Sequence, residues 1–292
     1  MPESPNWCIM AVHAHPDDEV IGTGGTFLRY AEEGQRTVLV CATRGEEGEI
    51  HDPDLVEEEA RPRLAEIRTR ELQGAAQVLK IGSVELLDYR DSGMAGTPAN
   101  EHPACFHQAD LDEATARLVR LIRHHRPDVL ISYNAFGGYG HPDHIKAHLI
   151  TKAAFERAAE PTFAPTPELN PWQPVKLYET AIPREAMVRL REIMRQRNPN
   201  PQAEQDSNAW DPEKLGTAEA EITTILDTRR YREARLAALR CHRTQIPEDS
   251  FFLQPFPEGV SSDLFFGSEH FVRVRSLVPA PDREDDLLAG LR

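Results

Sequence analysis

The sequence has few cysteines and no paired cysteine motif. Its 292 residues include Cys8, Cys41, Cys105 and Cys241, and no C-x-x-C pair. A chain of this length with so few cysteines does not depend on a framework of disulfides. Cys8 and Cys41 lie in apolar segments, which predicts that both are buried thiols of the core.

Long hydrophobic runs and a surplus of basic residues are also lacking. No stretch approaches the roughly 18 consecutive apolar residues of a membrane-spanning helix. Residues 1–10 have neither the basic start nor the apolar region of a secretion signal. The net charge is −15, from 33 basic and 48 acidic residues. Nucleic acids and anionic membranes select basic surfaces, so we predict a cytoplasmic protein that binds neither.

Strand-like and helix-like segments alternate through the first 160 residues. Strands are expected at 7–14, 36–43, 84–89 and 128–134, and helices at 19–34, 57–82, 110–127 and 142–160. This alternation indicates βαβ units. We therefore predict an α/β fold of Rossmann-like type, with a mainly parallel sheet and helices on both faces.

The pattern loosens after residue 160. Strands are expected at 175–182 and, as an edge strand, at 269–278, and helices at 183–197 and 224–242. We further expect a polar, mobile loop at 198–216 and a frayed acidic tail over the last dozen residues. Neither an internal repeat nor a linker is visible. The sequence therefore predicts a single domain over 1–292, with a core at 1–160 and a C-terminal elaboration at 161–292.

Two clusters of charged and imidazole side chains follow predicted parallel strands. AHPDDEV contains His15, Asp17 and Asp18, and AFGGYGHPDH contains His141 and His144. Ligands of open parallel sheets bind beyond the carboxyl ends of the strands, so both clusters are expected at one edge. Because uncompensated buried charge is very costly, either these carboxylates are solvated at the strand end or a cation lies among them, and the presence of two such junctions favours the cation.

The spacing within the clusters favours a metal site. His15 and Asp18 are three residues apart, and at the start of a helix this brings both side chains towards one face. Two histidines with one carboxylate bind hydrolytic zinc, and the same set binds iron(II) for oxygen chemistry. Asp17 diverges from Asp18 by about 100° on a helix. It could reach a water at the metal as a general base, or simply cap the helix.

The paired motifs resemble those of the LmbE-like, or PIG-L, family of zinc-dependent N-deacetylases, in order and layout over residues 8–160. The resemblance implies zinc, with iron(II) as the alternative in vivo, on His15, Asp18 and His144. It further implies Asp17 as general base, His141 as an electrostatic stabiliser or acid, and Tyr139 as a contact of the developing oxyanion.

Two more stretches resemble one subgroup of that family. RDSGMAGT at 90–97 and GEEGE at 45–49 are similar to the deacetylase of N-acetylglucosaminyl-inositol in mycothiol synthesis and to its sister, mycothiol-conjugate amidase. The implied substrate is a small N-acetylated amino sugar, bound by Asp91 and Met94, with Arg68 as a further donor. Residues 161–292 would shape the pocket for it. The acyl group, the aglycone, the choice between the two activities and a homo-oligomer stay open.

Alternatives from other classes are an iron(II) oxygenase with the same ligands and a catalytically inactive binding module. Asp17 separates the oxygenase from a hydrolase, because an oxygenase needs no general base beside the water site. The intact set of ligands, base and acid candidate argues against the inactive binding module. GTGGT at 22–26 lacks the G-x-G-x-x-G spacing, so we predict close packing there and no dinucleotide site. A second metal at His102, Cys105 and His107 is not favoured. His242 is explained by the dipole at a helix C-terminus.

Overall fold

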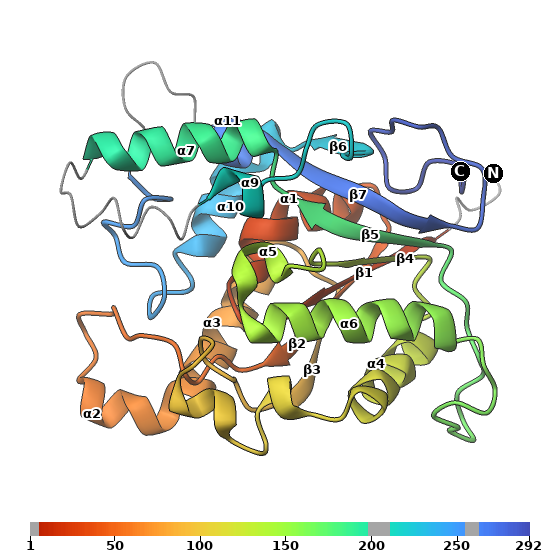
Figure 1. Cartoon of the computed structure of the whole chain (residues 1–292), viewed down its shortest axis with the longest axis horizontal. Coiled ribbons are helices and arrows are strands. Elements are labelled where there is room, and N and C mark those ends of the chain that lie inside the picture. Colours follow the sequence, from red (N-terminus) through yellow and green to blue (C-terminus); the bar gives the residue numbers. More distant parts are fainter. Residues whose placement is uncertain (1–5, 198–210, 255–262) are drawn as a thin grey trace.

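The computed structural model describes residues 6–197, 211–254 and 263–292. Within them, seven strands form a sheet in the order β3-β2-β1-β4-β5-β7-β6 (Figure 1). Their bounds are β1 (Cys8–His13), β2 (Arg36–Thr43), β3 (Ser83–Tyr89), β4 (Val129–Ser132), β5 (Lys176–Ala181), β6 (Thr224–Asp227) and β7 (Ser268–Ser276). β1 to β5 are parallel, and β7 is antiparallel to both of its neighbours. The predicted α/β class is therefore confirmed.

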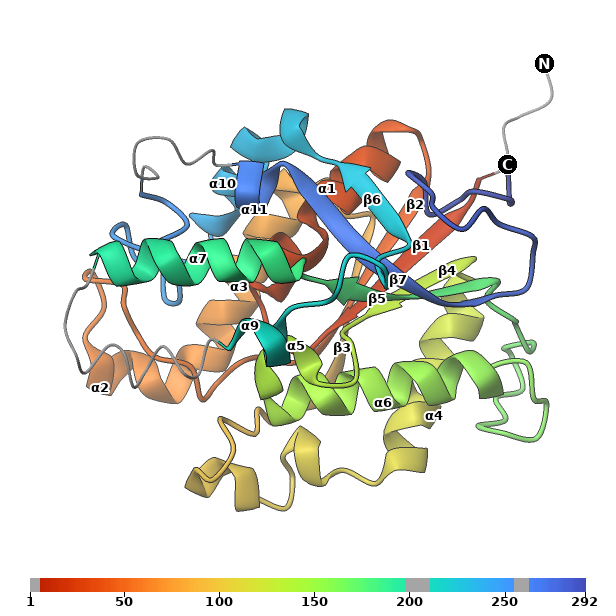
Figure 2. The ribbon, with the colours of Figure 1, turned by 45° about the horizontal axis from the view of Figure 1, so that its top comes forward.

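Helices cover both faces of the sheet, as Figure 2 shows. α1 (Asp18–Glu32), α3 (Leu64–Val78) and α10 (Arg232–Leu239) pack together on one face, and α4 (Leu111–His125) and α6 (Pro142–Arg157) on the other. The shorter or peripheral elements are α2 (Glu57–Ala60), α5 (Gly137–Gly140), α7 (Arg184–Arg197), α9 (Pro212–Leu215), α11 (Asp263–Phe266) and the 3-10 turns η1 (Arg61–Arg63), η2 (Pro98–Glu101), η3 (Phe106–Gln108) and η4 (Arg229–Tyr231).

β1 shows why the sheet needs helices on both sides. Met10 and Val12 belong to the apolar cluster under α4 and α6, whereas Ile9 and Ala11 belong to the cluster on the opposite face. Side chains alternate along a strand, so a continuous apolar run must be buried on both faces. Cys8 and Cys41 are fully buried free thiols, which confirms the prediction for them.

Three predictions for secondary structure were wrong. The expected helix at 57–82 is broken into α2, η1 and α3, with Pro62 in η1 where its ring prevents a regular helical bond. The first residues of the expected helix at 224–242 form β6, in which buried and exposed side chains alternate. β7 is not an edge strand, because β6 pairs with its outer side.

The C-terminal tail is packed rather than frayed. Leu287 and Leu288 are fully buried, and the backbone N–H of Leu287 donates to the hydroxyl of Tyr30 at 2.7 Å. The buried ammonium of Lys176 lies 3.0 Å from a carboxylate oxygen of Glu284. The acidic composition of the tail suggested that it is solvated. However, the two leucines of the tail and this ion pair fix the tail to the sheet. Most of the loop predicted at 198–216 lies outside the described residues, and its end forms α9.

α1 approaches the C-terminal segment closely through its glycines. A Cβ at Gly25 would lie 2.4 Å from Cγ2 of Thr228, whereas one at Gly24 would lie 3.4 Å from Cγ of Arg235. The predicted close packing is thus confirmed for Gly25. This glycine packs against Thr228, in the turn after β6, and against Glu269 of β7.

Gly25→Ala is expected to destabilise the protein by about 1–3 kcal/mol, because overpacking a fixed contact outweighs the better helix propensity of alanine. Gly24→Ala is the matched control, expected to be neutral or stabilising by up to about 1 kcal/mol. Chemical denaturation of both variants measures this difference. Equal stability of the two would contradict the close contact.

Candidate metal centre and catalytic site

Two neighbouring strands carry the predicted site at one edge of the sheet. β1 pairs with β4, and each is followed by a polar junction and a helix, α1 or α6. The junctions meet, because Nδ1 of His15 lies 3.2 Å from Nε2 of His144. The expected juxtaposition of the two clusters is therefore present in the fold.

Three ligand atoms form a nearly regular triangle. Oδ2 of Asp18 lies 3.5 Å from Nδ1 of His15 and 3.4 Å from Nε2 of His144, and the two nitrogens are 3.2 Å apart. Zinc bonds of about 2.0–2.1 Å at tetrahedral angles place ligand atoms about 3.3 Å apart. The triangle therefore has the dimensions of one face of a tetrahedral site.

The distal nitrogens of both histidines are bound to the protein. Nε2 of His15 lies 3.2 Å from Oδ2 of Asp143 and 3.5 Å from Oδ1 of Asp91. Nδ1 of His144 lies 3.1 Å from the carbonyl of Gly137, which has a φ of 68° and leaves no room for a Cβ. Metal-binding histidines commonly donate their other N–H to such carboxylates and carbonyls. Both rings are thus oriented with the free nitrogen towards the triangle.

Asp143 was missed as a site residue, although it is the aspartate of the second His-Pro-Asp. It is fully buried and accepts hydrogen bonds from the backbone N–H of Ser92, at 2.9 Å, and from the Ser92 hydroxyl. The repeated tripeptide was the available signal. The aspartates of the two His-Pro-Asp tripeptides make different contacts: Asp143 contacts the ring of His15, and Asp17 contacts Arg68.

The electrostatics favour positive charge in the triangle. The carboxylate of Asp91, with those of Asp143 and Asp18, outweighs burial and holds the pKa of His15 well above its usual value. Conversely, the two histidines overcome the effect of burial and hold the pKa of Asp18 well below its usual value. A cation bound among these groups would supply the positive charge that compensates the buried carboxylates.

His141 lies beside the triangle, with its ring centroid 4.5 Å from that of His15. His15, His141 and His144 also come close enough together to hold an ion. However, Nδ1 of His141 accepts the backbone N–H of Asp143 at 3.1 Å, so its neutral ring carries the proton on Nε2. Burial and the neighbouring histidines lower the pKa of His141 to about 4. This nitrogen is arranged to donate a hydrogen bond rather than to bind a metal.

Asp17 stands next to the triangle in an unusual backbone conformation, with a φ of 110°. Although it occupies the N-cap position of α1, its side chain makes no capping hydrogen bond. Oδ2 instead accepts from Nη2 of Arg68 at 3.1 Å. Burial raises the pKa of Asp17 to about 6, while the Arg68 guanidinium opposes the rise. Strained residues with perturbed pKa values cluster at active sites.

Arg68 is buried behind this carboxylate. It is 3% exposed, and its guanidinium also donates to the carbonyls of Gly45 and Pro16, each at 2.6 Å. The contact of Arg68 with a substrate stays a prediction, because in this structure the guanidinium bonds to the protein itself. Because Arg68 joins Pro16 and Asp17, in the loop after β1, to Gly45, in the loop after β2, the structure gives it the position of a support for Asp17.

The other predicted substrate residues lie after β3. Asp91 is 4% exposed, and its carboxylate accepts backbone N–H groups of Gly93 and Glu47 at 2.8 and 3.2 Å. Together with its contact to His15, these bonds make it a partner of the metal centre. Met94 lies on the exposed loop that follows. Of Asp91 and Met94, only Met94 is exposed to solvent.

Tyr139 and His242 complete the surroundings. Tyr139 is 48% exposed, and its ring centroid lies 4.9 Å from that of His144. Burial, with the charge of Asp18, raises the pKa of its hydroxyl, which therefore remains a donor. Nε2 of His242 lies 2.8 Å from Oε1 of Glu19, and both side chains are fully buried. The helix-dipole explanation of His242 is thus replaced by a buried pair at the start of α1, where Glu19 also accepts the backbone N–H of Asp17.

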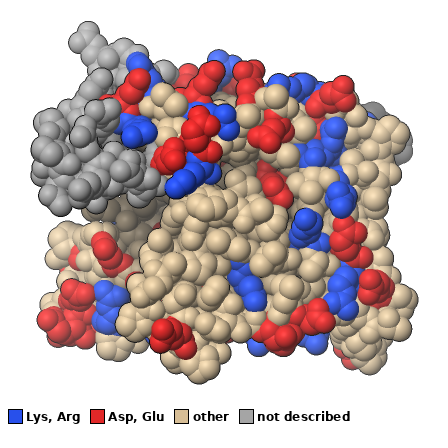
Figure 3. Space-filling model, viewed as in Figure 1, with Lys and Arg blue, Asp and Glu red and all other residues tan. Residues whose placement is uncertain are grey.

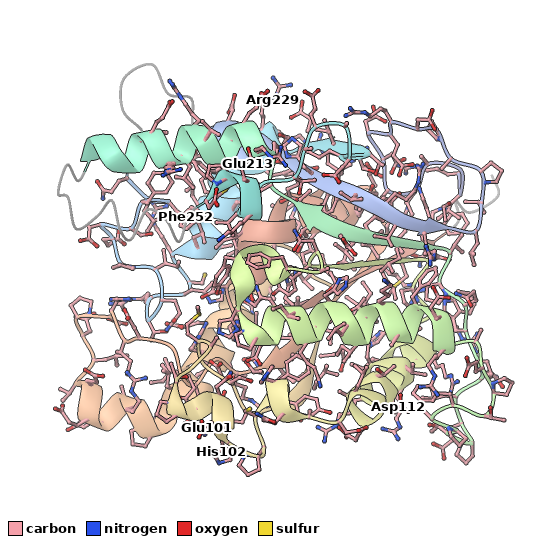
Figure 4. All side chains as sticks on the ribbon, in the orientation of Figure 1. Glu101, His102, Asp112, Glu213, Arg229 and Phe252 are labelled. Carbon is pink, nitrogen blue, oxygen red and sulfur yellow. The ribbon has the colours of Figure 1, made fainter. Side chains whose placement is uncertain are left out.

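The stretch with the alternative metal ligands lies elsewhere. His102 projects at the lower edge of the molecule in Figure 4, away from the sheet. Cys105 is buried, whereas His102 is exposed. Among the described residues, the groups close enough to hold an ion all include His15.

Known proteins resemble this chain over most of its length. Residues 10–155 match the PIG-L family, described as GlcNAc-PI de-N-acetylase. A 1D-myo-inositol 2-acetamido-2-deoxy-alpha-D-glucopyranoside deacetylase 2 of Frankia casuarinae is 46% identical, over 97% of this chain and 93% of the relative. The protein of the same name from Frankia alni is also 46% identical, over 97% and 99%.

A solved structure shows the same fold at lower sequence similarity. N,N'-diacetylchitobiose deacetylase from Pyrococcus horikoshii has a TM-score of 0.62 and 22% identity, covering 92% of this chain and 84% of that one. The predicted family and, with it, the predicted enzyme class, an N-deacetylase, are confirmed. The chain belongs to the PIG-L family.

Proposed function

We propose that the chain removes the acetyl group from an N-acetylglucosaminyl-inositol, using a zinc ion bound by His15, Asp18 and His144. The triangle of ligand atoms carries the metal assignment. The relatives that are 46% identical over 97% of the chain carry the substrate assignment, because they are named for that reaction. An iron(II) oxygenase is not favoured, since it would have no use for Asp17 as a base.

The site contains the groups that amide hydrolysis needs. A zinc ion at the triangle would polarise the amide carbonyl and activate water. The carboxylate of Asp17 accepts the proton of the attacking water. Nε2–H of His141 and the hydroxyl of Tyr139 can donate to the developing oxyanion. Because Asp17 then carries a proton, it can return this proton to the leaving amine as the C–N bond breaks.

The surface agrees with a small-molecule substrate. Acidic and basic side chains are interspersed over the described residues of the face in Figure 3, without a continuous basic area there. No helix in the described parts of the chain is long and apolar enough to cross a membrane. The cytoplasmic location, the homo-oligomer, the single domain and the native metal stay predictions.

The inositol conjugate is expected to be a better substrate than free N-acetylglucosamine, with a kcat/KM at least about tenfold higher. Contacts with a remote part of the substrate contribute to transition-state binding. Release of the free amine from both compounds by the purified, zinc-loaded protein measures the ratio. Equal kcat/KM values would reduce the proposal to a general amino-sugar deacetylase, and no release from either compound would refute it.

A further inference from the structure

A cavity of about 420 Å³ opens from the metal triangle. Asp18, His144 and Tyr139 line one part of it. Small-molecule sites typically measure about 300–1,000 Å³. An acetyl group has only three heavy atoms, so the cavity offers far more space beside the reacting carbonyl than acetyl requires.

The wall away from the triangle is apolar and comes from the C-terminal elaboration. Its residues include Ile182, Ala186, Met187, Leu190, Leu215 and Phe252. Figure 4 shows Phe252 below α7, the helix that contributes Met187 and Leu190. On the opposite side, Ile21 lies one turn of α1 after Asp18, lines the same cavity and is 42% exposed. An open apolar surface of this kind usually marks a binding site.

Polar groups in the lining are largely used by the protein itself. Nε2 of His13 lies 2.8 Å from the hydroxyl of Thr23. Glu269 accepts the backbone N–H of Thr26 at 2.8 Å, and Oδ1 of Asn134 accepts two backbone N–H groups of its own turn. A sugar or inositol placed deep in this cavity would leave hydroxyls without partners, which is costly.

We propose that this cavity binds the acyl side of the amide, and that the chain hydrolyses N-acyl amino sugars with a medium-length alkyl or aryl acyl group. The inference rests on the proposed function, which places the amide carbonyl at the triangle. Nδ1 of His15 faces the triangle while its Nε2 faces Asp91, and neither Asp91 nor Met94 lines the cavity. The polar sugar can therefore leave on the side of Met94 while the acyl chain enters the cavity.

The reaction itself is unchanged. Water adds to the carbonyl, the C–N bond breaks, and the products are a carboxylic acid and the free amine. Each methylene that becomes buried can strengthen binding by about fourfold. The acetyl, butanoyl and hexanoyl amides of glucosaminyl-inositol should therefore show equal or rising kcat/KM along the series.

The purified holoenzyme is assayed with all three amides by amine release. A kcat/KM for the hexanoyl amide equal to or above that for the acetyl amide supports the inference. Hydrolysis of the acetyl amide with a lower value for the hexanoyl amide overturns the inference and leaves the proposed function standing. Absence of hydrolysis for all three overturns the proposed function, and the inference with it.

Variants of α7 test whether this cavity is responsible. Met187→Trp, at a side chain that is 2% exposed, should lower the hexanoyl-to-acetyl ratio of kcat/KM at least tenfold by filling the cavity. Ala186→Phe provides a second, smaller obstruction should the tryptophan variant not fold. Val188→Trp, on the exposed side of the same helix, should keep the wild-type ratio. An unchanged ratio in a folded Met187 or Ala186 variant would place the acyl chain elsewhere.

Discussion

Asp17→Asn is expected to lower kcat by about a hundred- to ten-thousand-fold, the usual contribution of a general base. The amide keeps the size of the carboxylate but accepts no proton at neutral pH. Asparagine also takes positive φ more readily than most residues, so the backbone at 110° should persist. The loss should therefore be one of proton transfer rather than of folding.

Metal content and steady-state kinetics, measured on the same preparation, separate these causes. The metal should remain at wild-type stoichiometry, because Asp17 is not part of the ligand triangle. Asp88→Asn serves as the control for removing an acidic charge, since Asp88 is paired with Arg44 at the surface. A kcat of Asp17→Asn within about twofold of wild type, with full metal, would exclude the base role, because that loss is normally far larger.

The meeting of the two clusters could be predicted from sequence because the information for it is local, whereas the choice of His15, Asp18 and His144 as ligands came from the family resemblance and stays a prediction. Each cluster follows a strand that is recognisable by its apolar run, and the parallel arrangement brings the strand ends to one edge. The separation of roles between Asp17 and Asp18 was also accessible, because adjacent residues at a helix start point in different directions. Short motifs at such junctions therefore specify chemistry before any tertiary contact is known.

The supporting contacts could not be predicted, because their partners are distant in sequence. Glu19 and His242 are separated by 223 positions, and Asp17 and Arg68 by 51. No periodicity or spacing links such pairs. For the same reason the contact of Arg68 with Asp17 could not be predicted: it depends on how α3 packs against the loop after β1, which the sequence pattern does not reveal.

The C-terminal part was the least predictable region. β6 has only four residues and precedes a helical pattern, so propensity favoured extending the helix through it. Pairing with β7 overrides that local preference. The cavity beside the triangle has the same origin, because it is formed between α1, the segment after β4 and segments from residue 180 onward. Its apolar character depends on the assembly of these segments and not on any one of them.

His144→Ala is expected to reduce bound metal from about one ion per chain to a small fraction and to abolish measurable deacetylation. Loss of a supporting contact alone typically costs about 10–100-fold in affinity or activity, so loss of a ligand should cost more. The variant also leaves Asp18 and His15 with one fewer partner in a buried site. Elemental analysis of dialysed protein gives the stoichiometry directly.

His148→Ala is the matched control for this variant, because His148 is a buried histidine one turn further along α6 that contacts the carbonyl of Tyr133 at 3.0 Å. Both variants remove an imidazole from the same helix, but only His144 lies in the triangle. Metal should be retained in the His148 variant, even if its stability falls. Full metal retention and activity in His144→Ala would contradict the proposed metal centre. Metal loss in both variants would show that the effect comes from a disturbed α6 and not from the loss of a ligand.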